Sequence, residues 1–427
     1  MLNNAEYVNP NKGLRREDTM KNTNYVALVL AGGKGTRLSV LTKDISKPAI
    51  VFGGKHRLID FTLSNCKHSN ANVVGIVTQY HGRNLADYIG CGSQWLPDSM
   101  SAKITTLPPP ERNGVSELYN GTADAILKNA WFIDHYNPKN ILVLSADHVY
   151  KMNYAKMIKA HEHSGSAATI AAINVPLSEA SRFGIMITNG NDEIIDFVEK
   201  PDFPQSRMAS MGVYVFNWAV LKRHLLRTCE LCGAGSDIGR DIIPGMLKAG
   251  EKLSAHRFNG YWNDVGDIYS LWEANIELLS ASPGMNLHDD KWGIISRNSR
   301  KLHHHKHLKT DESRITNSLV TEDAVIKGAV VNSVISDNVE IGKDATVIDS
   351  VIMPGARIGK GSLVMRSLIG ANVVVDDYTA LGAVKPDGKY LDNCRGVSVV
   401  GSNATVYTQK NGSLGSIETS RPAACAV

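Results

Sequence analysis

Apolar and polar residues follow two different patterns along this chain, and the change between them falls near residue 310. Before that point, short β-branched runs alternate with amphipathic stretches of helical length. Strands, the more apolar of them buried on both faces, are predicted at 25–30, 73–78, 141–145, 169–175, 194–198 and 212–216. Apolar residues three and four positions apart predict helices at 123–135 and 154–163. The alternation indicates an α/β domain with a mostly parallel, Rossmann-like sheet.

After residue 310 the chain is rich in valine, isoleucine and glycine and carries a short repeat. The triplets Ser333-Val334-Ile335, Ser350-Val351-Ile352 and Ser367-Leu368-Ile369 lie 17 residues apart (350 − 333 and 367 − 350). A period this short predicts one solenoid coil per repeat, with aliphatic residues inside and glycine at the corners. The stretch resembles the left-handed β-helix of hexapeptide repeats, and an irregular all-β domain is the alternative.

These patterns divide the chain into five parts. We expect a flexible N-terminal extension at 1–23, an α/β domain at 24–285, a linker at 286–312, a β-helix at 313–410 and a flexible tail at 411–427. Met20 is an alternative start to Met1, since the first strand pattern opens only a few residues after it. The linker contains four histidines among lysines, which we interpret as solvated rather than as a metal site: His303, His304, His305 and His307.

Composition narrows the function classes. Lys and Arg exceed Asp and Glu by only four (46 − 42), which argues against nucleic acid as a partner. The chain has no signal-peptide pattern and no apolar run of membrane-spanning length, so we expect a cytoplasmic protein without a membrane partner. Six cysteines at irregular spacings do not form a disulfide framework. Cys229 and Cys232 make a single CxxC, whereas a structural zinc site needs four ligands.

A glycine-rich loop follows the first predicted strand. In Ala31-Gly32-Gly33-Lys34-Gly35-Thr36-Arg37, three glycines within four positions let the backbone approach a phosphate, and the lysine and arginine add positive charge. The loop has neither the Walker ending nor the GxGxxG register of a dinucleotide site. The alternative is a glycine turn that serves only helix–strand packing. Lys47-Pro48 follows ten residues after Arg37, within reach of the same anion.

Gly-x-Gly-Thr-Arg followed by Lys-Pro is similar to the signature of nucleotidyltransferases that act on sugar phosphates. From this point the chain resembles the bacterial ADP-glucose pyrophosphorylases (glucose-1-phosphate adenylyltransferases) nearly end to end. The resemblance implies a GT-A-like nucleotidyltransferase domain followed by a β-helix. It is carried by the segments 52–61, Thr78-Gln79-Tyr80, Tyr119-Asn120-Gly121-Thr122-Ala123, Asp147-His148-Val149-Tyr150, Phe197-Val198-Glu199-Lys200-Pro201, 209–214 and Tyr261-Trp262-Asn263-Asp264-Val265-Gly266.

The reaction that this resemblance implies is attack of glucose 1-phosphate on the α-phosphorus of ATP, with release of pyrophosphate. Because the second pKa of a phosphate monoester is about 6, the attacking group is already ionised at neutral pH and needs no general base. Cations and a metal must instead bring two anions together. The resemblance implies that Arg37, Lys47 and Asp147 are the catalytic residues and that Asp147 and Asp264 share Mg²⁺.

The remaining site residues are also carried over from the resemblance. The expected nucleotide-binding residues are Leu30, Ala31, Gly32, Gly33, Gly35, Thr36, Gln79, Tyr119, Gly121 and Thr122. The expected residues for glucose 1-phosphate are Tyr119, Gly184, Glu199, Lys200, Ser210, Tyr214, Asp237 and Trp262. The family further implies a homotetramer, allosteric control and the supply of ADP-glucose for glycogen biosynthesis.

Several positions depart from the family's pattern: Asp44, Leu118, Asn120, Ala146, Ile238 and Asp267. Asp44 stands where the enteric enzymes have the lysine that binds fructose 1,6-bisphosphate, so activation by that compound is not expected. The departures leave two alternatives open. One is a non-catalytic regulatory subunit that assembles with an active paralogue as a hetero-oligomer, and the other is a nucleotidyltransferase that uses UTP or dTTP.

Overall fold

The computed structural model describes residues 25–97, 102–112, 115–232, 235–382, 395–408 and 414–418. The extension expected at 1–23 lies outside the described residues, as does most of the expected tail. Within that tail, β31 (Leu414–Glu418) pairs antiparallel with β30 (Ala404–Thr408), so this part of it is a strand.

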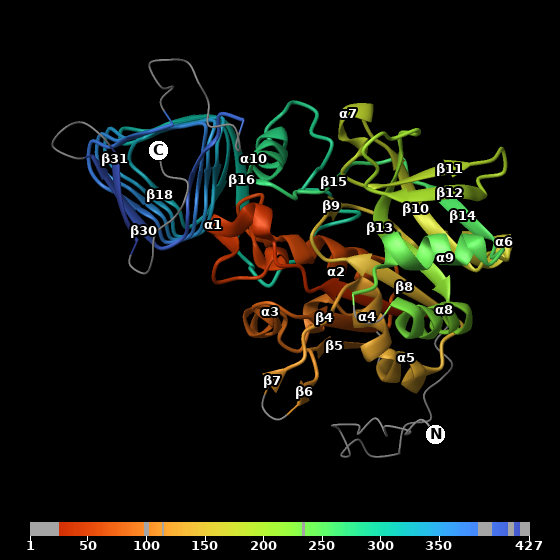
Figure 1. The fold of residues 1–427 in the computed structure, drawn as a ribbon. Coiled ribbons are helices and arrows are strands. Elements are labelled where there is room, and N and C mark those ends of the chain that lie inside the picture. The colour runs from red at the N-terminus through yellow and green to blue at the C-terminus, as the bar shows by residue number, and fades with distance from the viewer. Residues whose placement is uncertain are drawn as a thin grey trace.

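The first domain is built on a nine-stranded sheet, which is confirmed as the core of an α/β fold (Figure 1). The order is β12-β11-β13-β8-β1-β4-β5, and β10 pairs with β13 and β14. The strands are β1 (Tyr25–Ala31), β4 (Val73–Thr78), β5 (Lys103–Leu107), β8 (Asn140–Ser145), β10 (Ala168–Asn174), β11 (Gly184–Thr188), β12 (Ile194–Glu199), β13 (Met208–Asn217) and β14 (Leu253–Arg257).

The two halves of this sheet run differently. Strands β8, β1, β4 and β5 are parallel, as the βα alternation predicts. Strand β13 is antiparallel to β8, and β11 and β12 form an antiparallel pair. A connection of only five residues, 189–193, joins β11 to β12, and such a short link permits only antiparallel neighbours. The sheet is therefore mixed, with its parallel part on the side of the glycine loop.

Helices cover the sheet (Figure 1). They are α1 (Ser39–Thr42), α2 (Leu58–His68), α3 (Gly82–Ile89), α4 (Thr122–Lys128), α5 (Ala130–Tyr136), α6 (Tyr154–Ser164), α7 (Leu177–Ala180), α8 (Trp218–Cys232), α9 (Ile243–Lys248) and α10 (Ile268–Glu277). The single helix expected at 123–135 is divided at Asn129, which has non-helical torsions (φ −102°, ψ 13°) and donates from its side chain to the Ala125 carbonyl. In the described part of the chain, no helix has the length and apolar character needed to cross a bilayer.

The second domain is a solenoid of strands that stack into a three-sided prism, all parallel to their neighbours in the stack except β31, which is antiparallel to β30 (Figure 1). Its strands are β17 (Arg314–Thr321), β18 (Val325–Ile326), β19 (Ala329–Val331), β20 (Val334–Ile335), β21 (Glu340–Ile341), β22 (Thr346–Ile348), β23 (Val351–Ile352), β24 (Arg357–Ile358), β25 (Leu363–Met365), β26 (Ser367–Ile369), β27 (Val374–Val375), β28 (Ala380–Leu381), β29 (Ser398–Val400), β30 and β31.

The repeat of 17 is confirmed by the pairing register, since Val334 pairs with Val351 and Val351 with Leu368. Glycine was expected at the corners. One corner column instead has Asn332, Asp349 and Arg366 at φ 46°, 47° and 43°. Asn and Asp adopt this left-handed conformation more readily than most other residues with a side chain. Between neighbouring coils, Asn332 Nδ2 donates to Asp349 Oδ1 at 2.5 Å.

The solenoid sheet begins earlier than the expected boundary at residue 313. Strand β16 (Leu302–Lys309) pairs antiparallel with β17, so the histidine-rich segment is an edge strand and not an irregular linker. Histidines alternate between the two faces of a strand, and His303 and His305 lie on one face with ring centroids 6.0 Å apart.

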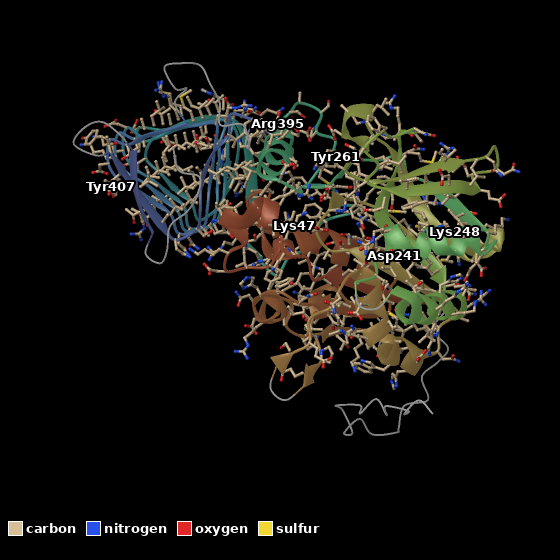
Figure 2. The ribbon with its side chains drawn as sticks, viewed as in Figure 1. Lys47, Asp241, Lys248, Tyr261, Arg395 and Tyr407 are labelled. Atoms are coloured by element: carbon tan, nitrogen blue, oxygen red, sulfur yellow. The ribbon has the colours of Figure 1, made fainter. Side chains whose placement is uncertain are left out.

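The two domains pack against each other through α10. One hydrophobic cluster joins Leu271 and Trp272 of α10 to Val334 and Val351 of the solenoid. Trp272 Nε1 donates to the Asp349 carbonyl at 2.7 Å. Arg395, labelled in Figure 2, places its guanidinium over the ring of Tyr269. The solenoid is thus a packed neighbour of the first domain.

Candidate active site

A cavity of about 520 Å³ opens at the carboxyl ends of the parallel strands. Strands β4, β1 and β8 are adjacent, so the residues that follow them meet at one edge of the sheet. These residues are Gln79 after β4, Gly32 and Gly33 after β1, and Asp147 after β8. The volume is within the range of ordinary small-molecule sites, about 300–1,000 Å³. The position is the one at which open α/β sheets bind their ligands.

The glycine loop forms one end of this cavity. Gly35 has φ +62°, and a Cβ at this position would lie 3.1 Å from Thr42 Cγ2 and 3.2 Å from Lys47 Cβ. Glycine is therefore favoured at position 35 because the backbone is left-handed there and because a side chain would have no space. Lys34 and Arg37 line the cavity beside Gly32 and Gly33. Backbone and cations together make this end suitable for phosphate groups.

A second wall comes from the segment at 119–122. Gln79 Nε2 donates to the Tyr119 carbonyl at 3.1 Å and thereby joins this segment to the end of β4. Gly121 has φ +115°, and a Cβ there would lie only 2.2 Å from the Ser236 carbonyl oxygen, so glycine is required. Thr122 Oγ1 donates to Asp237 Oδ2 at 2.8 Å and links the wall to the opposite end of the cavity.

That opposite end lies on the antiparallel half of the sheet. Gly184 of β11 pairs with Glu199 of β12, and a Cβ on Gly184 would lie 2.8 Å from Glu199 Oε2. Lys200 has a left-handed backbone (φ 47°), which is unusual for a residue other than glycine. Its Nζ lies 3.2 Å from Glu199 Oε1. Ser210 Oγ donates to the Tyr214 hydroxyl at 3.2 Å.

Two carboxylates and a lysine lie between the two ends. Strand β15 (Trp262–Asn263) pairs antiparallel with β9 (Val149–Tyr150), which brings Asp264 beside the residues that precede β9. Lys47 Nζ donates to Asp147 Oδ2 at 2.8 Å and to Asp264 Oδ1 at 3.3 Å. The Lys47 side chain is 8% exposed. One buried ammonium therefore bridges two carboxylates that come from distant parts of the chain.

This bridge sets the charge of Lys47 and of Asp147. Burial opposes the charge on Lys47, yet the two carboxylates hold the pKa of its ammonium above the usual value. Burial would likewise raise the pKa of Asp147, but the charge of Lys47 and the hydrogen bonds from Lys47 and Ser145 hold that pKa well below the usual range. Lys47 and Asp147 are thus both charged at neutral pH.

Most of the predicted site residues line this one cavity. They are Leu30, Gly32, Gly33, Arg37, Lys47, Gln79, Tyr119, Gly121, Thr122, Asp147, Gly184, Glu199, Lys200, Ser210, Tyr214, Asp237 and Asp264. Four predicted residues do not reach its wall: Ala31, Gly35, Thr36 and Trp262. Ala31 is buried at the end of β1, and Trp262 packs behind the wall against His148 and Phe183.

Sequence reasoning missed four polar residues of the cavity: Tyr80, Ser145, His148 and Arg182. Ser145 Oγ donates to Asp147 Oδ1 at 2.5 Å. Arg182 Nη2 is buried without a hydrogen-bond partner among the described residues and lies 3.8 Å from Asp264 and 3.5 Å from Asp267. The two residues near Asp147 could have been found from their place at the end of β8, but no local pattern marks Arg182.

The departure at Ala146 is accommodated by the local packing. Its N–H donates to the Leu30 carbonyl at 3.2 Å, and its methyl group is fully buried in the hydrophobic core. The alanine therefore leaves Asp147 at the cavity wall. Leu118 and Asn120 are exposed beside the cavity.

Comparison with protein-family models matches residues 26–281 to the nucleotidyl transferases. Residues 300–400 match the GlmU-like C-terminal hexapeptide repeats. The first match covers more than half of the chain and coincides with the domain that holds the cavity. Fold, cavity and family model together define an enzyme of the nucleotidyl transferase class.

Curated relatives narrow this class. The chain is 46% identical over 328 residues to a glucose-1-phosphate adenylyltransferase of Clostridium botulinum (strain Eklund 17B / Type B), covering 77% of this chain and 84% of the relative. Enzymes of the same name from Bacillus cereus (strain Q1) and Desulforamulus reducens are 46% and 43% identical over 356 and 389 residues. These matches cover 83% and 91% of this chain, and 94% and 96% of the relatives. The chain belongs to the glucose-1-phosphate adenylyltransferase family.

Proposed function

We propose that this protein transfers the adenylyl group of ATP to glucose 1-phosphate, with formation of ADP-glucose and release of pyrophosphate. The observation that carries the proposal is the layout of the cavity. A cationic glycine loop lies at one end, Lys200 and Glu199 lie at the other, and Asp147 and Asp264 lie between them. Such an arrangement suits two phosphorylated ligands that meet in the middle.

The chemistry follows from the charges. A phosphate oxygen of glucose 1-phosphate forms a bond to the α-phosphorus of ATP, and the bond between the α-phosphorus and the bridging oxygen to the β-phosphate breaks, so pyrophosphate leaves. Lys34 and Arg37 would neutralise the departing pyrophosphate, and Lys200 would hold the sugar phosphate. Glu199 and Asp237 would accept hydrogen bonds from glucose hydroxyl groups. Positioning and charge neutralisation thus account for the catalysis.

The residues present also fit a magnesium ion. Asp147 and Asp264 turn carboxylate oxygens toward a common point, and carboxylate oxygens are the protein ligands that Mg²⁺ prefers. When bound, Mg²⁺ would supply positive charge against the phosphate oxygens. Lys47 contacts the same two carboxylates and would share them with the ion.

Pyrophosphate release tests the proposal. Purified protein is incubated with Mg²⁺, glucose 1-phosphate and, in separate reactions, ATP, UTP or dTTP. We expect rapid release with ATP. No release with any nucleotide would indicate a regulatory subunit and refute the enzymatic proposal, while faster release with UTP or dTTP would refute the adenylyl assignment. Asp147→Asn should abolish turnover, whereas Asp192→Asn, a control at an exposed surface ion pair with Arg257, should not.

Three further expectations belong to this proposal. The reaction would supply ADP-glucose for glycogen biosynthesis in the cytoplasm. The enzyme would be allosteric, without activation by fructose 1,6-bisphosphate, because Asp44 takes the place of the binding lysine. It would form a homotetramer, and the exposed sheet face of the solenoid around Val325 and Val374 supports subunit contacts there. Light scattering tests the last point, and a monomer in solution would contradict it.

A further inference from the structure

His148 is held in one orientation at the centre of the cavity. It follows Asp147, and its Nδ1 lies 3.1 Å from the carbonyl oxygen of Met211. Since a carbonyl can only accept, Nδ1 carries a proton, and in the neutral imidazole Nε2 then presents its lone pair. A ring nitrogen that donates to a backbone carbonyl while the other nitrogen faces the site is the usual arrangement of a metal-binding histidine.

Packing fixes the ring as well. The imidazole meets the indole ring of Trp262 edge to face, with centroids 5.2 Å apart. On another side lies Gly212, which has φ +68°, and a Cβ there would lie only 3.2 Å from His148 Cε1. The side chain is 13% exposed. These contacts leave little freedom for Nε2 to turn away from the carboxylates.

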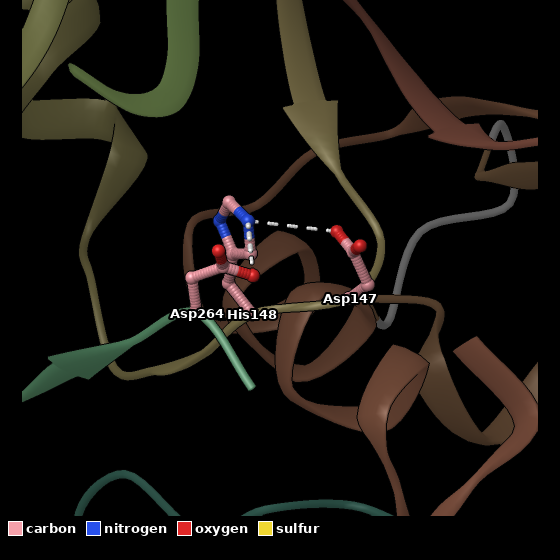
Figure 3. Close-up of side chains that lie close together, drawn as sticks. All are labelled: Asp147, His148 and Asp264. Atoms are coloured by element: carbon pink, nitrogen blue, oxygen red, sulfur yellow. Dashed lines mark ion pairs between the residues drawn. The ribbon is translucent and has the colours of Figure 1, made fainter. Parts of the chain in front are cut away.

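Nε2 faces both carboxylates but touches neither (Figure 3). It lies 3.6 Å from Asp147 Oδ1 and 3.7 Å from Asp264 Oδ1, beyond hydrogen-bond distance of each. All three ligand atoms lie within 4.8 Å of one another. With metal–ligand bonds of about 2.0–2.2 Å, two ligands of one ion are separated by roughly 3–4 Å. The distances from Nε2 to the two carboxylate oxygens are therefore in the range expected for two ligands of one ion.

We propose that His148 is a third protein ligand of the catalytic divalent cation, with Nε2 binding the same ion as Asp147 and Asp264. This inference rests on the proposed function, which places the ion at the two carboxylates. A nitrogen ligand strengthens binding of Mn²⁺ and Co²⁺ relative to Mg²⁺ when compared with a site made of oxygen atoms alone. The site thus accepts Mg²⁺ but binds Mn²⁺ more tightly.

Manganese binding without substrates tests the ligand directly. Mn²⁺ is added at less than one equivalent per chain, free ion is measured by continuous-wave EPR, and nitrogen coordination by electron spin-echo envelope modulation. The variant is His148→Phe, which keeps the ring size, and the matched control is His256→Phe, which removes a half-buried imidazole from β14 outside the cavity.

We expect ¹⁴N modulation in the unchanged protein and in His256→Phe, and its loss in His148→Phe together with at least about tenfold weaker Mn²⁺ binding. Labelling the unchanged protein with ¹⁵N-histidine should also remove the ¹⁴N signal, a result that does not depend on how the variant folds. Absence of ¹⁴N modulation, or modulation and affinity that persist in His148→Phe, would overturn the proposal.

This test is separate from the test of the reaction. Pyrophosphate release with ATP in a protein that shows no ¹⁴N modulation would remove His148 from the metal site and leave the proposed function standing. A His148-dependent signal in a protein that releases no pyrophosphate with any nucleotide would support the ligand and refute the reaction.

Discussion

Replacement of Lys47 by methionine removes the ammonium that holds the two carboxylates of the site together. Methionine keeps the length and most of the volume of the side chain, so the change is electrostatic. Lys47 Nζ lies 2.8 Å from Asp147 and 3.3 Å from Asp264, whose side chains are 26% and 13% exposed. In the variant, two nearly buried carboxylates lie side by side without their main counter-ion.

Loss of one partner from a buried ion pair costs about 3–5 kcal/mol. Arg182 lies near the carboxylates and compensates in part, so we expect the low end, about 3 kcal/mol. At about 2–4 °C per kcal/mol, the melting temperature of the first domain should fall by about 6–12 °C.

The loss should depend on pH. The pKa of Asp147 is lowered in the folded protein, so this carboxylate stabilises the fold above its unfolded pKa, and that contribution disappears as pH falls through the folded value. Without Lys47, burial raises the pKa of the carboxyl instead. The difference in stability between Lys47→Met and the unchanged protein should therefore be largest above about pH 5 and become smaller below about pH 4.

Differential scanning calorimetry in EDTA at pH 7.5 and pH 4 measures both effects. Addition of Mg²⁺ should restore more stability to Lys47→Met than it adds to the unchanged protein, because the ion replaces the lost charge. Lys248→Met, at an exposed position of α9 (Figure 2), is the control and should melt normally. A Lys47→Met variant that melts like the unchanged protein in EDTA, or a loss that is equal at both pH values, would refute the reasoning.

Burial raises the pKa of Asp60 to about 7, so between pH 4 and pH 7 this carboxyl is protonated in the folded protein but ionised in the unfolded chain. The free energy of unfolding, compared with that of Asp60→Asn, should therefore fall by up to about 4 kcal/mol as the pH rises from 4 to 7, as urea unfolding would show. Arg182→Leu should lower kcat/KM by about 10–100-fold through loss of a charged contact to a phosphate, while Arg223→Leu at the surface leaves the steady-state kinetics unchanged. Gly121→Ala forces a Cβ against the Ser236 carbonyl and should weaken ATP binding in calorimetric titration; unchanged affinity would contradict the tight contact.

Local patterns in the sequence were enough to predict the two domains and part of the site. The glycine loop after β1 and Asp147 after β8 were found because a strand end is marked within a few residues by the change from apolar to polar positions. The solenoid could be predicted because similar triplets recur every 17 residues along the sequence. The resemblance to a known family added the roles of residues, such as Lys200, that no local pattern marks as functional.

Tertiary structure alone decided how these parts meet. Asp264 lies 117 residues after Asp147 (264 − 147), and only the pairing of β15 with β9 places both beside Lys47. The inclusion of Arg182 and the orientation of His148 likewise depend on contacts between distant segments. Periodicity records which face of an element is buried but not which distant segment covers it. The charges of Lys47 and Asp147, which depend on their contacts across the chain, could therefore be read only from the folded structure.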